Sequence, residues 1–219
     1  SDSFKAFVRD LTDELHIELG FEVKKDEELE IKEVRDTINK LRAKNLDDDS
    51  FIKKFSDIFK ENKMESISEG TFFSSILFIS ALDETNKIEI FLEKFENAES
   101  PQMQGRYRAV LGQVRDQNAS KKIVEFMLDG RIRGADCPYI LASMITNKYI
   151  GKKSWKVIKE NFNDLLNVMP DWTASRILDA LPAIYDEEFA DDIKNFIEKT
   201  GELLSWRLAI KPGRPVALG

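Results

Sequence analysis

Four arginines near the middle of the 219-residue chain are the side chains best suited to binding chemistry. Arg106 and Arg108 lie at the opening of one expected helix, and Arg131 and Arg133 lie in the equivalent loop one repeat later, just before Asp136. Guanidinium groups bind carboxylates through paired hydrogen bonds, and equivalent positions in stacked repeats line up along one surface. The four arginines could therefore form a row that binds a carboxylate; the alternative is ordinary ion pairing, for instance of Arg133 with Asp136.

The residues that catalysis usually needs are scarce, because the chain has one histidine, His16, and one cysteine, Cys137. An H-E-x-x-H zinc site needs two histidines, and a Ser-His-Asp or Cys-His mechanism would have to use His16. This histidine lies at the edge of an apolar helix face, where we expect a packed or surface role. Cys137 precedes Pro138 at an expected helix start, where the helix dipole could lower the pKa of its thiol, but a buried, inert cysteine is commoner and is what we expect. We predict no catalytic residue and no metal ligand in this chain.

Composition narrows the remaining classes of function. A net charge of −7 argues against nucleic-acid binding, which usually needs a basic face. The longest mostly apolar run, residues 72–82, is shorter than the roughly 20 residues of a membrane span. No phosphate-binding glycine loop is present, and the acidic run at residues 47–49 lacks the glycine and closing glutamate of a calcium loop. The single cysteine favours the cytoplasm, because it can form no internal disulfide.

Helical periodicity dominates the first 60 residues. An apolar face formed by Phe4, Phe7, Val8, Leu11 and Leu15 predicts an amphipathic helix that stops at Gly20. Two further segments, at residues 31–41 and 51–59, repeat the same spacing. No alternating run bounded by hairpin turns appears, so we predict an all-α fold.

From residue 71 onward the expected helices recur in pairs. Phe91, Val124 and Val157, in the second helix of successive pairs, are spaced 33 residues apart. Such a period is typical of helical arrays in which each pair buries its apolar face against its neighbours. We therefore predict a curved α-solenoid of HEAT/armadillo-like antiparallel helix pairs over residues 1–205, followed by an irregular tail over residues 206–219. Ser100 is expected to cap the helix that Pro101 opens. Pro182 is expected to kink or divide the first helix of the last pair.

A known family is recognisable in residues 128–165, "LDGRIRGADCPYILASMITNKYIGKKSWKVIKENFNDL". This stretch resembles the signature region of the C-terminal helical domain of zinc aminopeptidases of the aminopeptidase N and puromycin-sensitive aminopeptidase family. There a V-R-x-Q-D loop precedes a helix, and an N-x-x-G-x-x-x-x-W-x-F-x-x-x-N-W pattern follows. The matching positions here are Arg133, Asp136, Asn147, Gly151, Trp155, Asn161 and Phe162. Ala135 stands where the family has glutamine, and one extra residue separates the asparagine from the glycine.

Two further segments match the family in its order. Residues 19–28, "LGFEVKKDEE", resemble its L-G-W-E-x-K-x-x-E segment. Residues 95–116 resemble its Y-x-x-A-x-x-P-x-E-x-x-R-x-x-x-A-L-G helix pair, with Ala98, Pro101, Arg106, Leu111 and Gly112 on the matching positions. The resemblance covers roughly residues 4–200.

The resemblance implies a role within a larger enzyme. In that family an N-terminal β-domain and a thermolysin-like domain carry the zinc, its ligands and the general-base glutamate. The C-terminal helices form a bowl that closes over the active site. The chain would then be a non-catalytic fragment that encloses the peptide together with the catalytic domain of the same polypeptide. Arg131 and Arg133 would face the substrate, with Arg106 and Arg108 next, and Asp136, Asn147, Gly151 and Trp155 would be structural motif residues. The alternative is a stand-alone helical-repeat scaffold that binds a protein partner, because periodicity alone supports both.

Overall fold

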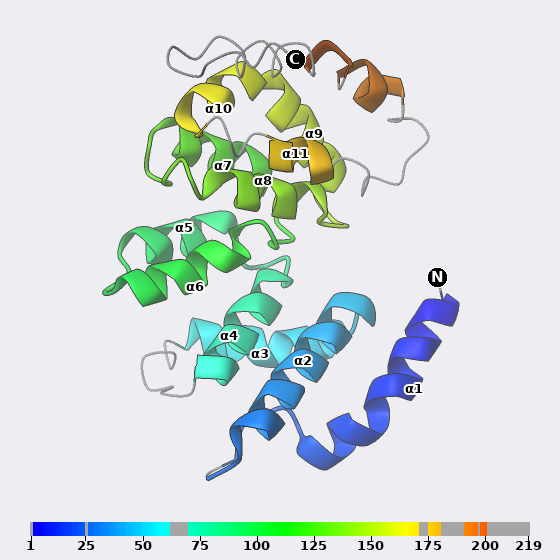
Figure 1. The fold of residues 1–219 in the computed structure, drawn as a ribbon. Helices are drawn as coiled ribbons and strands as arrows, with labels where there is room; N and C mark the ends of the chain where they lie inside the picture. The colour runs from blue at the N-terminus through cyan, green and yellow to red at the C-terminus, as the bar shows by residue number, and fades with distance from the viewer. Residues whose placement is uncertain are drawn as a thin grey trace, which may run out of the picture. The chain divides into compact units, whose positions relative to one another are not determined.

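The fold is all-helical in the part of the chain that the computed structural model describes, residues 2–24, 26–61, 70–170, 175–180, 191–196 and 198–200. Eleven labelled helices and no strand occur in these residues, which confirms the predicted fold class (Figure 1). The chain forms two compact units, Ser1–Ala119 and Ser120–Gly219. The curvature of a solenoid stays a prediction.

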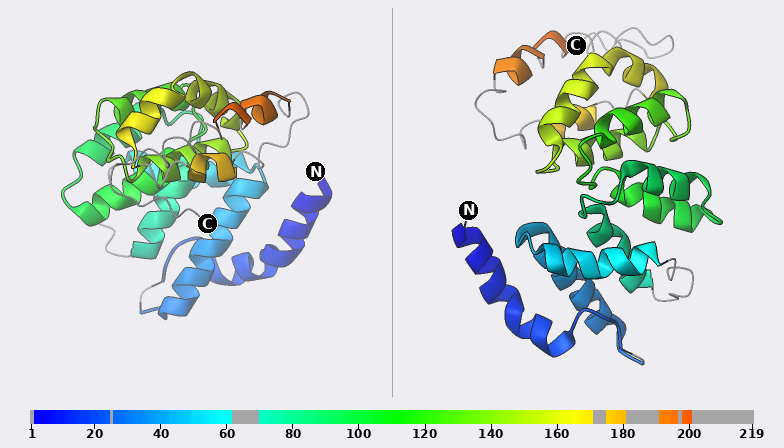
Figure 2. Two further views of the ribbon diagram at one scale, coloured as in Figure 1. Left: turned by 45° about the horizontal axis from the view of Figure 1, so that its top comes forward. Right: turned by 180° about the vertical axis from the view of Figure 1, so that it is seen from behind.

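The first unit contains six helices: α1 (Asp2–Leu19), α2 (Leu29–Asn45), α3 (Asp49–Lys60), α4 (Gly70–Ala81), α5 (Ile88–Glu96) and α6 (Pro101–Leu111). Helix α4 is central, since it packs against α2, α3 and α6, while α5 packs along α6 (Figure 2). Buried phenylalanines fill the core between these helices. The rings of Phe59 and Phe91 stack with centroids 5.1 Å apart, and Phe51 and Phe55 meet edge to face.

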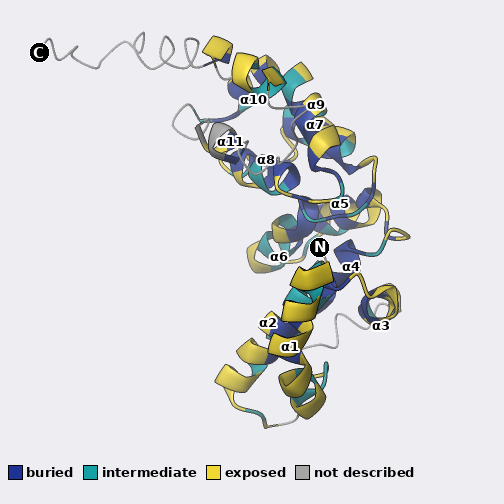
Figure 3. Cartoon of the chain, turned by 90° about the vertical axis from the view of Figure 1, so that its right-hand side faces the viewer, coloured by how far each residue is buried: buried dark blue, intermediate teal, exposed yellow. Residues whose placement is uncertain are grey.

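Helix α1 ends as the sequence predicts, at Gly20, whose φ of +71° suits a residue without a side chain. Of the five residues on its predicted apolar face, only Val8 is buried. The other four are exposed, and most of α1 is coloured as exposed in Figure 3. Helix α1 therefore contacts α2 with one edge of its apolar face and leaves the rest uncovered.

A buried arginine organises the connection between α1 and α2. The Arg35 side chain is 1% exposed and forms a bidentate ion pair with Glu27. Its Nε and Nη2 atoms also donate to the Leu19 carbonyl oxygen, at 3.3 and 3.2 Å. One turn later, the Asn39 amide donates to the Phe21 carbonyl oxygen at 3.0 Å. The family-like "LGFEV" segment is thus held in place by two side chains of α2.

The second unit contains α7 (Ala119–Leu128), whose first residue closes the first unit, then α8 (Cys137–Ile145), α9 (Gly151–Glu160), α10 (Phe162–Val168) and α11 (Ser175–Ala180). Residues 191–196 and 198–200 are helical as well. Helix α8 packs against α9 and α11, and α9 against α10. Trp155 of α9 is fully buried and meets Phe196 edge to face at 4.7 Å.

The predicted repeat is visible in the helix order but not in every detail. The predicted first helices α4 and α6 pack against each other, as expected of successive repeats. The most extensive helix–helix packing in the first unit, however, joins α4 to α3 and α2, and α5 packs on α6 rather than on its expected partner α4. Helix α10 was not predicted; it starts at Phe162, and only Asn161 separates it from the end of α9 at Glu160. Pro182 and the tail over residues 206–219 lie outside the described residues, so the predicted kink and domain limits stay predictions.

Candidate functional site

The loop that carries Arg131 and Arg133 is set by a glycine turn at the end of α7. Gly130 has a φ of +73°, and its N–H donates to the Met127 carbonyl at 3.1 Å. The Arg131 N–H donates to the Phe126 carbonyl at 3.0 Å. This pair of hydrogen bonds is the Schellman arrangement, in which a left-handed glycine satisfies the last carbonyls of a helix. The glycine therefore fixes where the two arginines leave the helix.

Two neighbouring residues fix the loop to the rest of the second unit. Ile132 is buried between the two arginines. A Cβ atom placed on Gly134 would lie 2.0 Å from the Val168 carbonyl oxygen at the end of α10. Only glycine fits there, because any side chain would overlap backbone atoms. Ile132 and Gly134 consequently fix the loop backbone on both sides of Arg133.

Both arginines of this loop are exposed and already engaged with a neighbour. The Arg131 guanidinium carbon lies 3.5 Å from the centroid of the Phe126 ring, a stacked geometry that suits arginine. Arg133 Nε donates to Asp136 Oδ2 at 2.9 Å, and the Arg133 side chain is 75% exposed. The ion pair named as the alternative in the sequence analysis is therefore present. It uses the Nε atom of Arg133.

A third guanidinium lies near the start of α8 and was missed by the sequence analysis. The Arg176 guanidinium carbon, from α11, lies 4.6 Å from the ring centroid of Tyr139. Tyr139 and Arg176 are both exposed, and Tyr139 follows Asp136 by three residues, so the two share a helix face. No sequence signal connects Arg176 to this loop, because only the packing of α11 on α8 brings it there.

The other two candidate arginines occupy a different kind of position. Helix α6 begins at Pro101, with Ser100 Oγ accepting from the Met103 N–H at 3.2 Å, so the predicted cap is confirmed. Arg106 and Arg108 consequently lie inside this helix and not at its opening, which corrects the sequence-based placement. Arg106 is half-buried, and its guanidinium carbon lies 5.0 Å from the Phe73 ring centroid. Positions inside a helix and in a loop are not equivalent, so the four arginines do not occupy matching positions of two repeats.

The family-like residues after this loop have structural surroundings. Asn147 is buried, and its Oδ1 atom accepts from the Tyr149 N–H at 2.9 Å. A Cβ atom on Gly151 would lie 2.5 Å from the Ile145 carbonyl oxygen, so this helix start admits only glycine. Trp155 Nε1 donates to Asp192 Oδ2 at 3.1 Å. The hydrogen bond from Lys159, followed by that from Trp155, lowers the pKa of the Asp192 carboxyl.

The two remaining reactive side chains are in unreactive surroundings. Cys137 is buried, which raises the pKa of its thiol to about 11, so the thiolate is scarce at neutral pH. His16 meets Phe51 edge to face at 5.4 Å; burial, followed by the charge of Arg42, lowers the pKa of its imidazole. Within the described residues no group of three or more histidine, cysteine or acidic side chains could hold a metal ion. None of the described helices has the length and apolar character needed to cross a bilayer.

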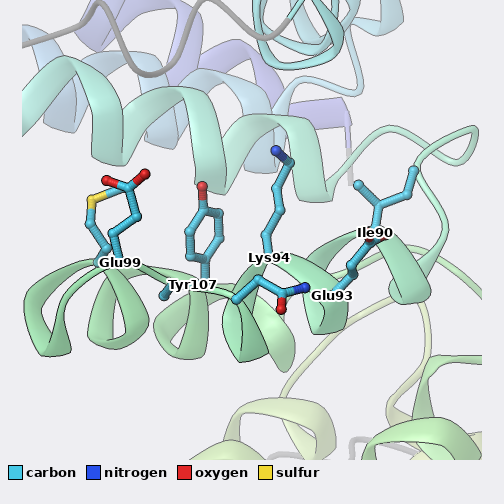
Figure 4. A pocket seen from close by; sticks show the side chains of 8 residues that line it. Ile90, Glu93, Lys94, Glu99 and Tyr107 are labelled. Carbon is cyan, nitrogen blue, oxygen red and sulfur yellow. The ribbon is translucent and has the colours of Figure 1, made fainter.

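A surface cavity of about 300 Å³ lies between α5 and α6 (Figure 4). It is lined by Ile90, Glu93, Lys94, Asn97, Ala98, Glu99, Met103 and Tyr107. Lys94 turns its ammonium group toward the Phe59 ring, at 5.6 Å from the centroid. The lining combines apolar side chains with the exposed Glu93 and Glu99 and the half-buried Lys94, and it contains none of the four candidate arginines. This cavity has no nucleophile paired with a base.

The described part of the chain is all-helical, and its exposed loop before α8 carries two arginines. The sequence matches the family described as ERAP1-like C-terminal domain over residues 1–211. Because this match spans nearly the whole chain, the chain belongs to that family and is a C-terminal domain of an ERAP1/aminopeptidase N-like aminopeptidase. No curated protein matches the chain.

Proposed function

We propose that the chain is the substrate-enclosing, non-catalytic domain of a zinc-dependent aminopeptidase that removes N-terminal residues from peptides. The observation that carries this proposal is the family match over residues 1–211. The chemistry of the chain agrees with it, since one histidine, with a lowered pKa and packed against Phe51, cannot build the family's zinc centre. The family match favours this function over a stand-alone scaffold.

The zinc ion and the general base would belong to the catalytic domain of the same polypeptide. The residues of this chain do not fit the metal, so its contribution is to enclose the peptide and to limit access to the active site. Opening and closing of such a domain can gate turnover. The single cysteine, which can form no internal disulfide, is the basis for placing the enzyme in the cytoplasm.

The exposed arginines of the loop before α8 would bind the C-terminal carboxylate of the peptide. Arg133 is the leading candidate, because its Nε–Asp136 hydrogen bond orients the guanidinium and it is highly exposed. Arg131, stacked on Phe126, is the second, and Arg176, stacked on Tyr139, is an addition from the structure. Arg106 and Arg108 of α6 rank lower because both are half-buried.

The test compares the 219-residue chain with the full-length gene product. An aminoacyl fluorophore should be cleaved by the full-length enzyme, with loss of activity on chelation and recovery with zinc. The 219-residue chain should show no cleavage, with or without zinc. Chelator-insensitive cleavage by the 219-residue chain would overturn the non-catalytic assignment. A full-length product without aminopeptidase activity would favour the scaffold.

A further inference from the structure

Helix α1 presents an uncovered apolar stripe, formed by Phe4, Phe7, Leu11 and Leu15. Their exposed fractions are 49%, 59%, 57% and 42%, high values for large apolar side chains. At about 100° per residue these four share a sector of about 80° around the helix. The stripe is therefore continuous along the helix and is not a scatter of single exposed residues, which would need no explanation.

The contacts of α1 with the first unit use a neighbouring sector. Val8 and Thr12 are buried, and Arg42 of α2 donates to the Thr12 hydroxyl at 2.9 Å. The His16 ring meets Phe51 of α3, and Lys5 pairs with Asp47 at 2.8 Å. These contacts fix how α1 is rotated about its own axis, near both of its ends and in its middle. The stripe cannot turn inward without breaking them.

The charged residues that border the stripe are all acidic. Asp10 and Glu14 lie along its exposed edge and Glu18 lies at its C-terminal end, and all three side chains are exposed. The basic residues of α1, Lys5 and Arg9, lie away from the stripe, on the opposite half of the helix. An apolar surface with a purely acidic border is complementary to an apolar surface with a basic border.

We propose that the α1 stripe is the docking surface for an amphipathic helix whose apolar face is bordered by lysine or arginine, supplied by the rest of the aminopeptidase polypeptide. The proposal rests on the proposed function for the source of that helix. A continuous exposed apolar surface on a soluble helix marks an interaction site, and the α1 stripe is such a surface. The stripe residues are spaced three and four apart, which is the spacing by which amphipathic helices recognise an apolar surface.

Thiol labelling tests this proposal directly, because Cys137, the single cysteine of the 219-residue chain, is buried. Labelling is read from the peptide that carries the introduced cysteine, so cysteines elsewhere in the full-length enzyme do not contribute. In the full-length enzyme, F7C should react with a maleimide several-fold more slowly than in the 219-residue chain. I17C is the matched control, because Ile17 is 83% exposed on the same helix but outside the stripe. It should react at the same rate in both proteins.

A second comparison tests the charge of the partner. Adding E14K to F7C in the full-length enzyme should speed the labelling, since a lysine in the acidic border repels a basic partner. Equal labelling rates for F7C in the two proteins would overturn the docking proposal. If E14K left the rate of F7C unchanged, the claim that the partner helix is bordered by basic residues would be wrong. Protection of F7C in the 219-residue chain that disappears on dilution would instead assign the stripe to a second copy. The aminopeptidase assay is independent of all these rates, so failure of the proposed function would be seen separately.

Discussion

Arg133 and Asp136 form an ion pair between the loop after α7 and the residue before α8, with 2.9 Å from Nε to Oδ2. The pair lies on the surface, and exposed pairs contribute about 0–1 kcal/mol to stability. Its main effect is to orient the Arg133 guanidinium.

The first prediction concerns stability. Arg133→Ala should change the free energy of unfolding by less than about 1 kcal/mol, because the ion pair is exposed. Urea unfolding followed by circular dichroism measures this. A loss of several kcal/mol would show that Arg133 holds the loop together and that its loss cannot be used as a test of binding.

The second prediction concerns the close approach of the loop to α10. Gly134→Ala should destabilise the protein by at least about 2 kcal/mol, because its Cβ would overlap the Val168 carbonyl oxygen. Gly105→Ala in α6 is the matched control, since its nearest neighbour, Arg108 Nη2, is 4.0 Å away. The control should stabilise the helix by about 0.5–1 kcal/mol. Equal unfolding midpoints for the two variants would contradict the Gly134 contact.

The third prediction concerns the buried ion pair of Arg35 and Glu27. Arg35→Ala should cost about 3–5 kcal/mol, because it leaves a carboxylate and the Leu19 carbonyl without their donor. Lys53→Ala, which removes an exposed pair with Asp57, should cost less than about 1 kcal/mol. Thermal unfolding of both variants gives the comparison. Similar losses of stability would mean that the buried Arg35 pair contributes no more than an exposed one.

The fourth prediction concerns acid stability at the turn after α4. Burial alone would raise the pKa of Asp83, but hydrogen bonds with Ser56 and Thr85 and the charge of Lys60 bring it down to about 2. A lowered folded-state pKa contributes stability above the ordinary value of 3.8, and this contribution is lost as the pH falls from there to about 2.

Asp83→Asn should therefore be less stable than the wild-type chain at pH 7, and the difference should shrink below pH 3.8. Unfolding free energies measured at several pH values follow this difference. A difference that stays constant down to pH 2 would show that the Asp83 charge contributes nothing.

Local signals in the sequence predicted the features that depend on a few neighbouring residues. Ser100 with Pro101 predicted the start of α6, and Gly20 predicted the end of α1, because caps and left-handed glycines act within one turn. The buried, inert surroundings of Cys137 followed from its residue type, because free cysteine is usually buried.

Tertiary packing decided the features that the sequence analysis missed. The need for glycine at position 134 comes from α10, more than 30 residues later, and Arg176 reaches Tyr139 only because α11 packs on α8. The exposure of Phe7 likewise depends on how α1 is rotated against α2, since periodicity shows which residues share a face but not what covers it.

The most direct measurement is the steady-state hydrolysis of two peptides by the full-length enzyme, one with a free C-terminal carboxylate and one with a C-terminal amide. We expect Arg133→Ala to raise KM for the free carboxylate by about tenfold, the loss of one charged hydrogen bond, and to leave KM for the amide unchanged. Lys121→Ala, on the exposed surface of α7, should change neither. An Arg133→Ala enzyme with the same KM as the wild type for both peptides would contradict the assignment of this loop to the substrate carboxylate.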